Sequence, residues 1–124
     1  MARSYRDLFV WRRAKTLASR IYRVTEQFPR DEIYGLTSQT RRAAVSVASN
    51  IAEGQGRITT GEFVHFLGQA RGSLLELDTQ LAIAADLTYL NLREYEALDK
   101  ELYQILGLLN RPIESLPRKV SARI

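Results

Sequence analysis

Apolar residues recur every three or four positions along most of the chain, and this period predicts four helices. The most regular run steps by four and three through seven positions: Phe63, Leu67, Ala70, Leu74, Leu77, Leu81 and Ala84. Such a run lies along one face of an α-helix, because the helix turns once every 3.6 residues or so. Thr59 and Glu62 have the spacing of a capping box, which satisfies free amide groups at a helix start. We expect this helix to run from Thr60 to about Asp86, a length of roughly 40 Å.

Three further segments show the same period. The first has its apolar face at Trp11, Ala14, Ala18, Ile21, Thr25 and Phe28, and is expected to end at Pro29. The second runs from Gly35–Thr37 to about Glu53; its apolar side chains are mostly small, so a neighbouring helix can approach closely. The last has apolar residues at Tyr95, Leu98, Leu102, Ile105 and Leu109, with start signals at Asn91 and Glu94 and with Pro112 and Pro117 at its end.

These segments predict an all-α fold. No segment shows the sustained alternation of a strand, and short connections between long helices favour an antiparallel up-down-up-down four-helix bundle. A chain of 124 residues suits one domain. We therefore expect a single bundle over residues 1–116, followed by a basic tail at 117–124.

The net charge of +4 is unevenly distributed. Residues 1–30 are strongly basic, residues 61–110 are acidic, and the tail is basic again. Arg6, Arg13 and Arg20 are seven residues apart and are predicted to line a stripe away from the helix seam, with Arg12 and Arg23 close to the seam. These five arginines are candidate nucleic-acid contacts, because arginine side chains bind phosphates and phosphate contacts would dominate the affinity for RNA or DNA. The alternative is that they form only a solvated helix face.

The segment EGQGR at residues 53–57 raises the question of a phosphate-binding loop. A P-loop follows a strand and continues into Gly-Lys-Ser/Thr, and this segment does neither. We expect Gly54 to end the second helix with a positive φ, and Gly56 to turn the chain toward the third helix. The alternative is a weak anion site made by Arg57 and the start of the third helix.

No metal site, cofactor or catalytic group is predicted. Glu62 and His65 have the Glu-x-x-His spacing of di-iron bundles, but such sites need two motifs and the chain has one histidine. It has no cysteine, which suits a reducing compartment, and no nucleophile–base pair is recognisable. The N-terminus lacks the apolar core of a signal peptide, and no run approaches the ~20 apolar residues that span a bilayer. We expect a cytoplasmic protein that does not contact membranes.

The outward positions of the third helix carry little charge and several small side chains. They include His65, Gly68, Gly72, Leu75 and Ile83. A solvated face normally carries more charge, so we expect this face to be an interface between copies of the chain. The alternative is that the extra apolar width packs against the neighbouring helices of the same bundle.

Four stretches together resemble one protein family. They read YRDLFVWRRA, YGLTSQTRRAAVSVASNIAEGQGR, EFVHFLGQARGSLLELDTQL and LTYL, and they are similar to the 23S rRNA-intervening sequence proteins, which are four-helix bundles. The stretches are also similar to accessory proteins of diversity-generating retroelements, which form basic barrels that bind nucleic acid and a reverse transcriptase. The resemblance implies a homo-oligomer, with a pentameric ring as the expected form. The residues that match the family's motifs are Arg41, Arg42, Asn50, Glu53, Gly54 and Arg57, then Glu62, Phe63, Gly72, Ser73, Glu76 and Gln80; the family implies no catalytic role for any of them.

The sequence therefore predicts a non-enzymatic homo-oligomer whose basic surface binds RNA or DNA, with a further protein as a candidate partner. The alternative is a structural or protein-interaction oligomer that binds no nucleic acid.

Overall fold

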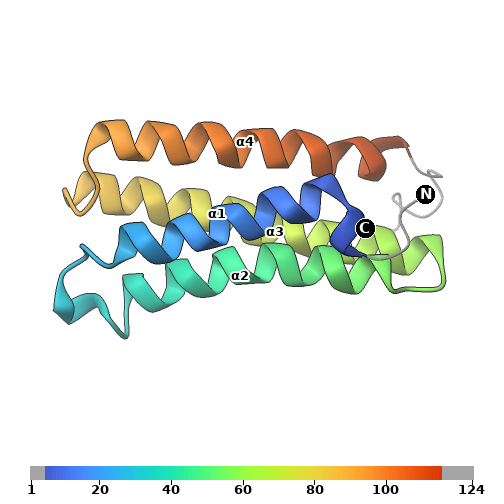
Figure 1. The fold of residues 1–124 in the computed structure, drawn as a ribbon, viewed down its shortest axis with the longest axis horizontal. Coiled ribbons are helices and arrows are strands. Elements are labelled where there is room, and N and C mark those ends of the chain that lie inside the picture. The colour runs from blue at the N-terminus through green and yellow to red at the C-terminus, as the bar shows by residue number, and fades with distance from the viewer. Residues whose placement is uncertain (1–4, 116–124) are drawn as a thin grey trace.

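The computed structural model describes residues 5–115, which form four long helices. They are α1 (Phe9–Thr25), α2 (Leu36–Gln55), α3 (Thr60–Asp86) and α4 (Leu92–Ser115), with short 3-10 helices η1 (Tyr5–Asp7) before α1 and η2 (Arg30–Glu32) before α2. Successive helices run in opposite directions, and α1 lies beside both α2 and α4 (Figure 1). The predicted all-α, up-down-up-down bundle is confirmed. The predicted basic tail, residues 117–124, lies outside the described residues.

One apolar core extends along the bundle. Every predicted α3 position from Leu67 to Ala84 is buried, and Phe63 is half-buried at the start of that face. In α1 the buried positions are Ala14, Leu17 and Ile21. α1 ends at Thr25, and turn hydrogen bonds carry the chain on to Phe28 before Pro29. Among the described helices, none is long and apolar enough to cross a membrane.

Side chains cap the N-termini of α3 and α4. The Glu62 N–H donates to Thr59 Oγ1 at 3.1 Å, and the Glu62 carboxylate accepts from the Thr59 N–H at 3.4 Å, which completes the predicted capping box. The Glu94 N–H donates to Asn91 Oδ1 at 2.8 Å, and the Asn91 N–H donates back to the Glu94 carboxylate at 3.2 Å. Both start signals in the sequence are therefore confirmed.

Gly54 does not end α2, so that prediction is wrong. The helix continues to Gln55, its C-cap Gly56 has φ −83°, and no glycine in residues 5–115 has a positive φ. The glycine allows close packing instead. A Cβ at Gly54 would lie 3.1 Å from Phe66 Cβ and 3.4 Å from the Phe63 carbonyl oxygen. The end of α2 can therefore lie directly against the start of α3.

Pro112 lies inside α4, so its prediction as a helix-ending residue is wrong, and Pro117 lies outside the described residues. Proline has no N–H and cannot bond to the carbonyl four residues earlier, yet the helix reaches Ser115. Ile113 packs against the core. This contact favours one more helical turn beyond the proline.

The connection from α3 to α4 is a tight turn with one strained residue. The Thr88 N–H donates to the Ala85 carbonyl at 3.0 Å and the Tyr89 N–H to the Ala84 carbonyl at 2.9 Å, which is the paired pattern of a Schellman motif. Thr88 takes the left-handed conformation that the motif requires, with φ 62°. A β-branched residue is disfavoured there, whereas glycine is not.

Candidate functional site

The basic residues of α1 lie on two sides of the helix. Arg13 and Arg20 point toward α4: the Arg13 guanidinium donates to the Gln104 side-chain oxygen, and Arg20 forms an ion pair with Glu101. The Glu101 side chain is only 12% exposed. Arg13 and Arg20 therefore lie off the apolar seam, as predicted, but they contact α4 and help to join it to α1; their role as nucleic-acid contacts stays a prediction.

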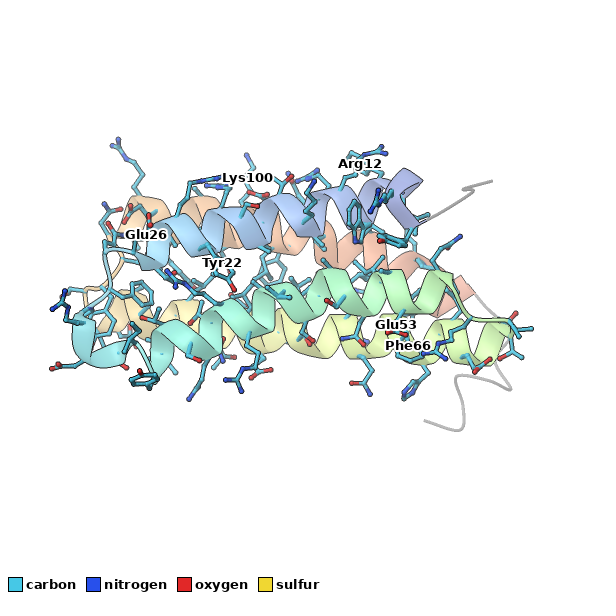
Figure 2. The ribbon with its side chains drawn as sticks, turned by 60° about the horizontal axis from the view of Figure 1, so that its bottom comes forward. Arg12, Tyr22, Glu26, Glu53, Phe66 and Lys100 are labelled. Carbon is cyan, nitrogen blue, oxygen red and sulfur yellow. The ribbon has the colours of Figure 1, made fainter. Side chains whose placement is uncertain are left out.

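The outward face of α1 carries Arg12, Lys15 and Arg23, all exposed, so the prediction that Arg12 and Arg23 lie close to the seam is wrong. The Arg12 guanidinium donates to the backbone carbonyl of Arg6 at 3.3 Å, which brings η1 and α1 together at this end. Figure 2 shows Arg12 at the edge of the bundle, away from α2 and α3. The helix α1 contains no acidic residue, so all the charge that it places on this face is positive.

Arg23 lies between two cavities. With Arg20 and Arg93 it lines a cavity of about 440 Å³ between α1 and α4. In the same cavity the Gln27 amide donates to the Glu94 carboxylate at 3.0 Å. Arg23 also lines a larger cavity between α1 and α2.

Arg57, the candidate anion contact, is already engaged within the chain. Its guanidinium pairs with the Glu53 carboxylate at 2.6 Å and lies 4.5 Å from the centre of the Phe66 ring. Figure 2 shows Glu53 and Phe66 together at the α2–α3 end of the bundle. At the nearby N-terminus of α3, the capping box of Thr59 and Glu62 already occupies the Glu62 N–H and the Thr59 N–H. This arrangement stabilises the α2–α3 connection.

The candidate assembly face on α3 is exposed as a continuous strip. His65, Gly68 and Gly72 are exposed, Leu75 is 40% exposed and Ile83 is 44% exposed. A Cβ at Gly68 or Gly72 would meet nothing within 4 Å. Packing within one chain therefore does not explain the two glycines, each of which costs a helix up to about 1 kcal/mol relative to alanine.

Small polar side chains join α2 to α3 behind this strip. The hydroxyl oxygens of Ser46 and Ser73 are 2.8 Å apart, and the Asn50 amide donates to both the carbonyl and the hydroxyl of Ser46. The polar groups of these three residues form hydrogen bonds with one another, so these side chains serve to pack α2 against α3.

A pair of carboxyl groups lies between α3 and α4. Asp78 Oδ1 and Asp99 Oδ1 are both buried, and the Tyr103 hydroxyl donates to Asp78 Oδ2 at 3.2 Å. A hydrogen bond to Asp78, reinforced by burial and by the Asp78 charge, raises the pKa of Asp99 to about 6. The same carboxylate raises the pKa of Tyr103. Sequence reasoning missed this pair because the two residues belong to helices whose relative register the sequence does not reveal.

His65 is exposed beside Phe66, with ring centres 5.3 Å apart. Within residues 5–115, no group of three or more histidine, aspartate or glutamate side chains is arranged to hold a metal ion.

Comparison with known proteins identifies the family. A family model described as 23S rRNA-intervening sequence protein matches residues 6–111. A solved structure from Bacteroides thetaiotaomicron, a protein with unknown function from the S23 ribosomal protein family, is 21% identical and aligns with a TM-score of 0.78, over 86% of this chain and 99% of that one. No functionally curated protein matches the chain. The structural match supports the same bundle fold, and the family match covers α1, α2, α3 and most of α4. The chain belongs to the 23S rRNA-intervening sequence protein family.

Proposed function

We propose that this protein is a non-enzymatic homo-oligomer that binds RNA or DNA through the outward face of α1. The observation that carries the proposal is the charge of α1, which has five basic residues and no acidic one. Arg12, Lys15 and Arg23 lie on its exposed side. Side chains arranged in this way can contact several phosphates of one strand.

The direct test is RNA binding by fluorescence anisotropy as salt is raised from about 50 to about 200 mM, since counterion release makes phosphate contacts salt-dependent. The variant Arg12→Glu/Arg23→Glu is expected to bind at least ~10-fold more weakly, because it removes two contacts and adds repulsion. The control Arg71→Glu/Lys100→Glu makes the same charge change on exposed positions of α3 and α4. An equal loss of RNA affinity in both double variants would show a general effect of net charge and would contradict a binding site on α1.

The exposed α3 strip supports the assembly part of the proposal. Glycines at positions 68 and 72 leave the α3 backbone open to close approach by another helix. A pentameric ring is the form that the family resemblance implies. The α3 strip would also serve the alternative function, a structural oligomer without nucleic acid, so RNA binding discriminates between the two.

Assembly is tested by light scattering on Gly72→Glu. The new carboxylate would enter the proposed contact, so smaller particles are expected. Gly107→Glu is the matched control, because Gly107 is also helical and exposed and a Cβ there meets nothing within 4 Å. A normal particle mass for Gly72→Glu, or the same loss in both variants, would count against the α3 interface.

A further inference from the structure

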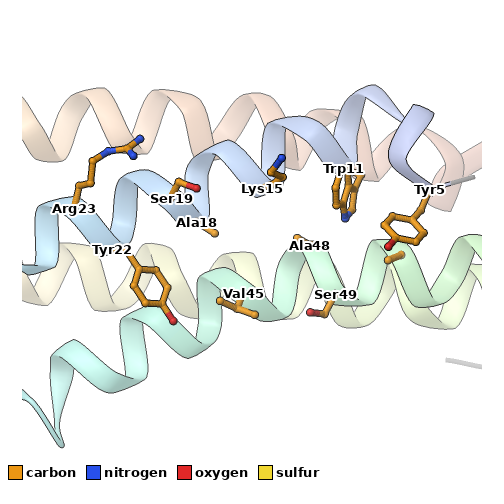
Figure 3. A pocket seen from close by; sticks show the side chains of 11 residues that line it. Tyr5, Trp11, Lys15, Ala18, Ser19, Tyr22, Arg23, Val45, Ala48 and Ser49 are labelled. Carbon is orange, nitrogen blue, oxygen red and sulfur yellow. The ribbon is translucent and has the colours of Figure 1, made fainter.

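An open groove of about 670 Å³ lies between α1 and α2. Its floor consists of small side chains, including Ala18, Ala48 and Ala52, which leave the two helices separated by a channel. Figure 3 shows Tyr5 and Trp11 at one end of the groove and Tyr22 at the other, with Lys15 and Arg23 on α1. The groove is larger than the cavity between α1 and α4.

The groove combines aromatic rings with positive charge. Three of its lining residues are aromatic, two are basic, and none of those within the described chain is acidic. Trp11 and Tyr5 pack edge to face with ring centres 5.1 Å apart, and the Lys15 ammonium lies 5.6 Å from the Trp11 ring centre. An occupant of this groove should therefore present flat apolar surfaces together with negative charge.

The Tyr22 ring is supported on one face and partly exposed to solvent, so a planar group can stack on it. The Arg41 guanidinium lies 4.7 Å from the centre of its ring, and Arg41 is itself fixed by hydrogen bonds to Thr25 Oγ1 at 2.8 Å and to the Tyr22 carbonyl at 3.2 Å. Tyr22 nevertheless remains 45% exposed. A ring supported on one face by a guanidinium and open elsewhere loses little freedom when a planar group binds to it.

We propose that the α1–α2 groove binds single-stranded nucleic acid, with bases stacked on Tyr22 and Trp11 and with phosphates beside Lys15 and Arg23. The proposal rests on the nucleic-acid function proposed above and specifies its substrate class. Successive bases stack on aromatic side chains while a positive groove follows the backbone in many single-strand binders. A duplex does not offer its base faces in this way, because they are stacked on one another.

Arg23 extends the path beyond the groove. It lines this groove and also the cavity that contains Arg20 and Arg93. A strand whose bases occupy the groove can thus continue its phosphates from Arg23 toward Arg93 on α4, in a cavity that also contains the Glu94 carboxylate. A helix from the acidic region of a second copy, residues 61–110, is the competing occupant, and the fluorescence test below distinguishes it from nucleic acid.

Trp11 provides the assay, because it is the only tryptophan of the chain. Titration with short oligouridine is expected to quench its fluorescence, whereas an RNA duplex of equal length should quench it weakly and bind less tightly. Tyr22→Ala should weaken oligouridine binding roughly 10-fold, as expected for the loss of one base–aromatic stack. Tyr22→Leu retains apolar volume and should show a similar loss. The control Tyr34→Ala removes a tyrosine that is 93% exposed and outside the groove.

The outcomes separate this proposal from the broader one. If Arg12→Glu/Arg23→Glu weakens binding but both Tyr22 variants bind oligouridine normally, the groove proposal is overturned and the α1 surface stands. Equal affinity for duplex and single strand would also overturn it. If Trp11 fluorescence changes with protein concentration alone and is insensitive to RNA, a second copy occupies the groove. Absence of any nucleic-acid binding would refute both proposals.

Discussion

Asp99→Asn should stabilise the protein at neutral pH, because Asp99 is one of two carboxyl groups that meet between α3 and α4. The folded protein holds the Asp99 proton more tightly than the unfolded chain does: the pKa is about 6 in the bundle and 3.8 in the reference state. Stabilisation from this proton is complete below pH 3.8 and is lost as the pH rises through about 6. Asparagine is neutral at every pH and its amide can donate to Asp78 throughout.

The size of the effect follows from the shift. A change from 3.8 to about 6 corresponds to about 3 kcal/mol if the interaction is fully expressed. Asp99 is only partly buried, and solvent screening reduces such interactions, so we expect a gain of about 1 kcal/mol for Asp99→Asn above pH 6. The gain should shrink and vanish as the pH falls toward 4, where the wild-type carboxyl is already protonated.

Urea unfolding followed by circular dichroism, at one protein concentration and several pH values, measures this difference. Glu96→Gln is the matched control, since it neutralises an exposed carboxylate on the same helix. If Asp99→Asn raises the free energy of unfolding by the same amount at pH 4 and pH 7, the proton shared with Asp78 is not the cause of the stabilisation. Loss of stability in Asp99→Asn at pH 7 would refute the unfavourable carboxyl pair itself.

Two glycine substitutions and one turn substitution test the helix contacts by thermal unfolding. Gly54→Ala should destabilise the fold by about 1 kcal/mol, because the overlap with Phe66 outweighs the better helix propensity of alanine; a raised melting temperature would contradict close packing there. Gly107→Ala, with open space around its Cβ, should instead stabilise by about 1 kcal/mol, and a loss of stability would show an unrecognised contact. Thr88→Gly should stabilise by about 1 kcal/mol by relieving the left-handed threonine, and no change would mean that the turn carries little strain.

Features set by local chemistry could be predicted from the sequence. The bounds of α3 follow from an apolar run and a capping box that lie within one segment. By contrast, the role of Gly54 depends on the distance to Phe66 in another helix, and the continuation of α4 past Pro112 accompanies a tertiary contact of Ile113. Local rules of helix termination therefore predicted Gly54 and Pro112 at helix ends, whereas both lie inside helices.

The site was only partly predictable for the same reason. The excess of basic residues in α1 is visible in the sequence, but which arginines face solvent depends on where α4 lies. Arg13 and Arg20 lie seven residues apart and share a face, as predicted, yet that face meets Gln104 and Glu101. The groove between α1 and α2 likewise depends on how far apart two helices stand, and no residue pattern gives that spacing.

The close packing of α2 against α3 makes this hairpin the part of the bundle that is hardest to open. Gly54, the Ser46–Ser73 contact and the buried face of α3 hold the two helices together, whereas α1, which also buries an apolar face, packs less extensively against either α2 or α4. Local opening should therefore release α1 before it separates α2 from α3. Backbone amides in the middle of α2 and α3 would then exchange with deuterium most slowly, and α1 could detach transiently while the hairpin stays folded.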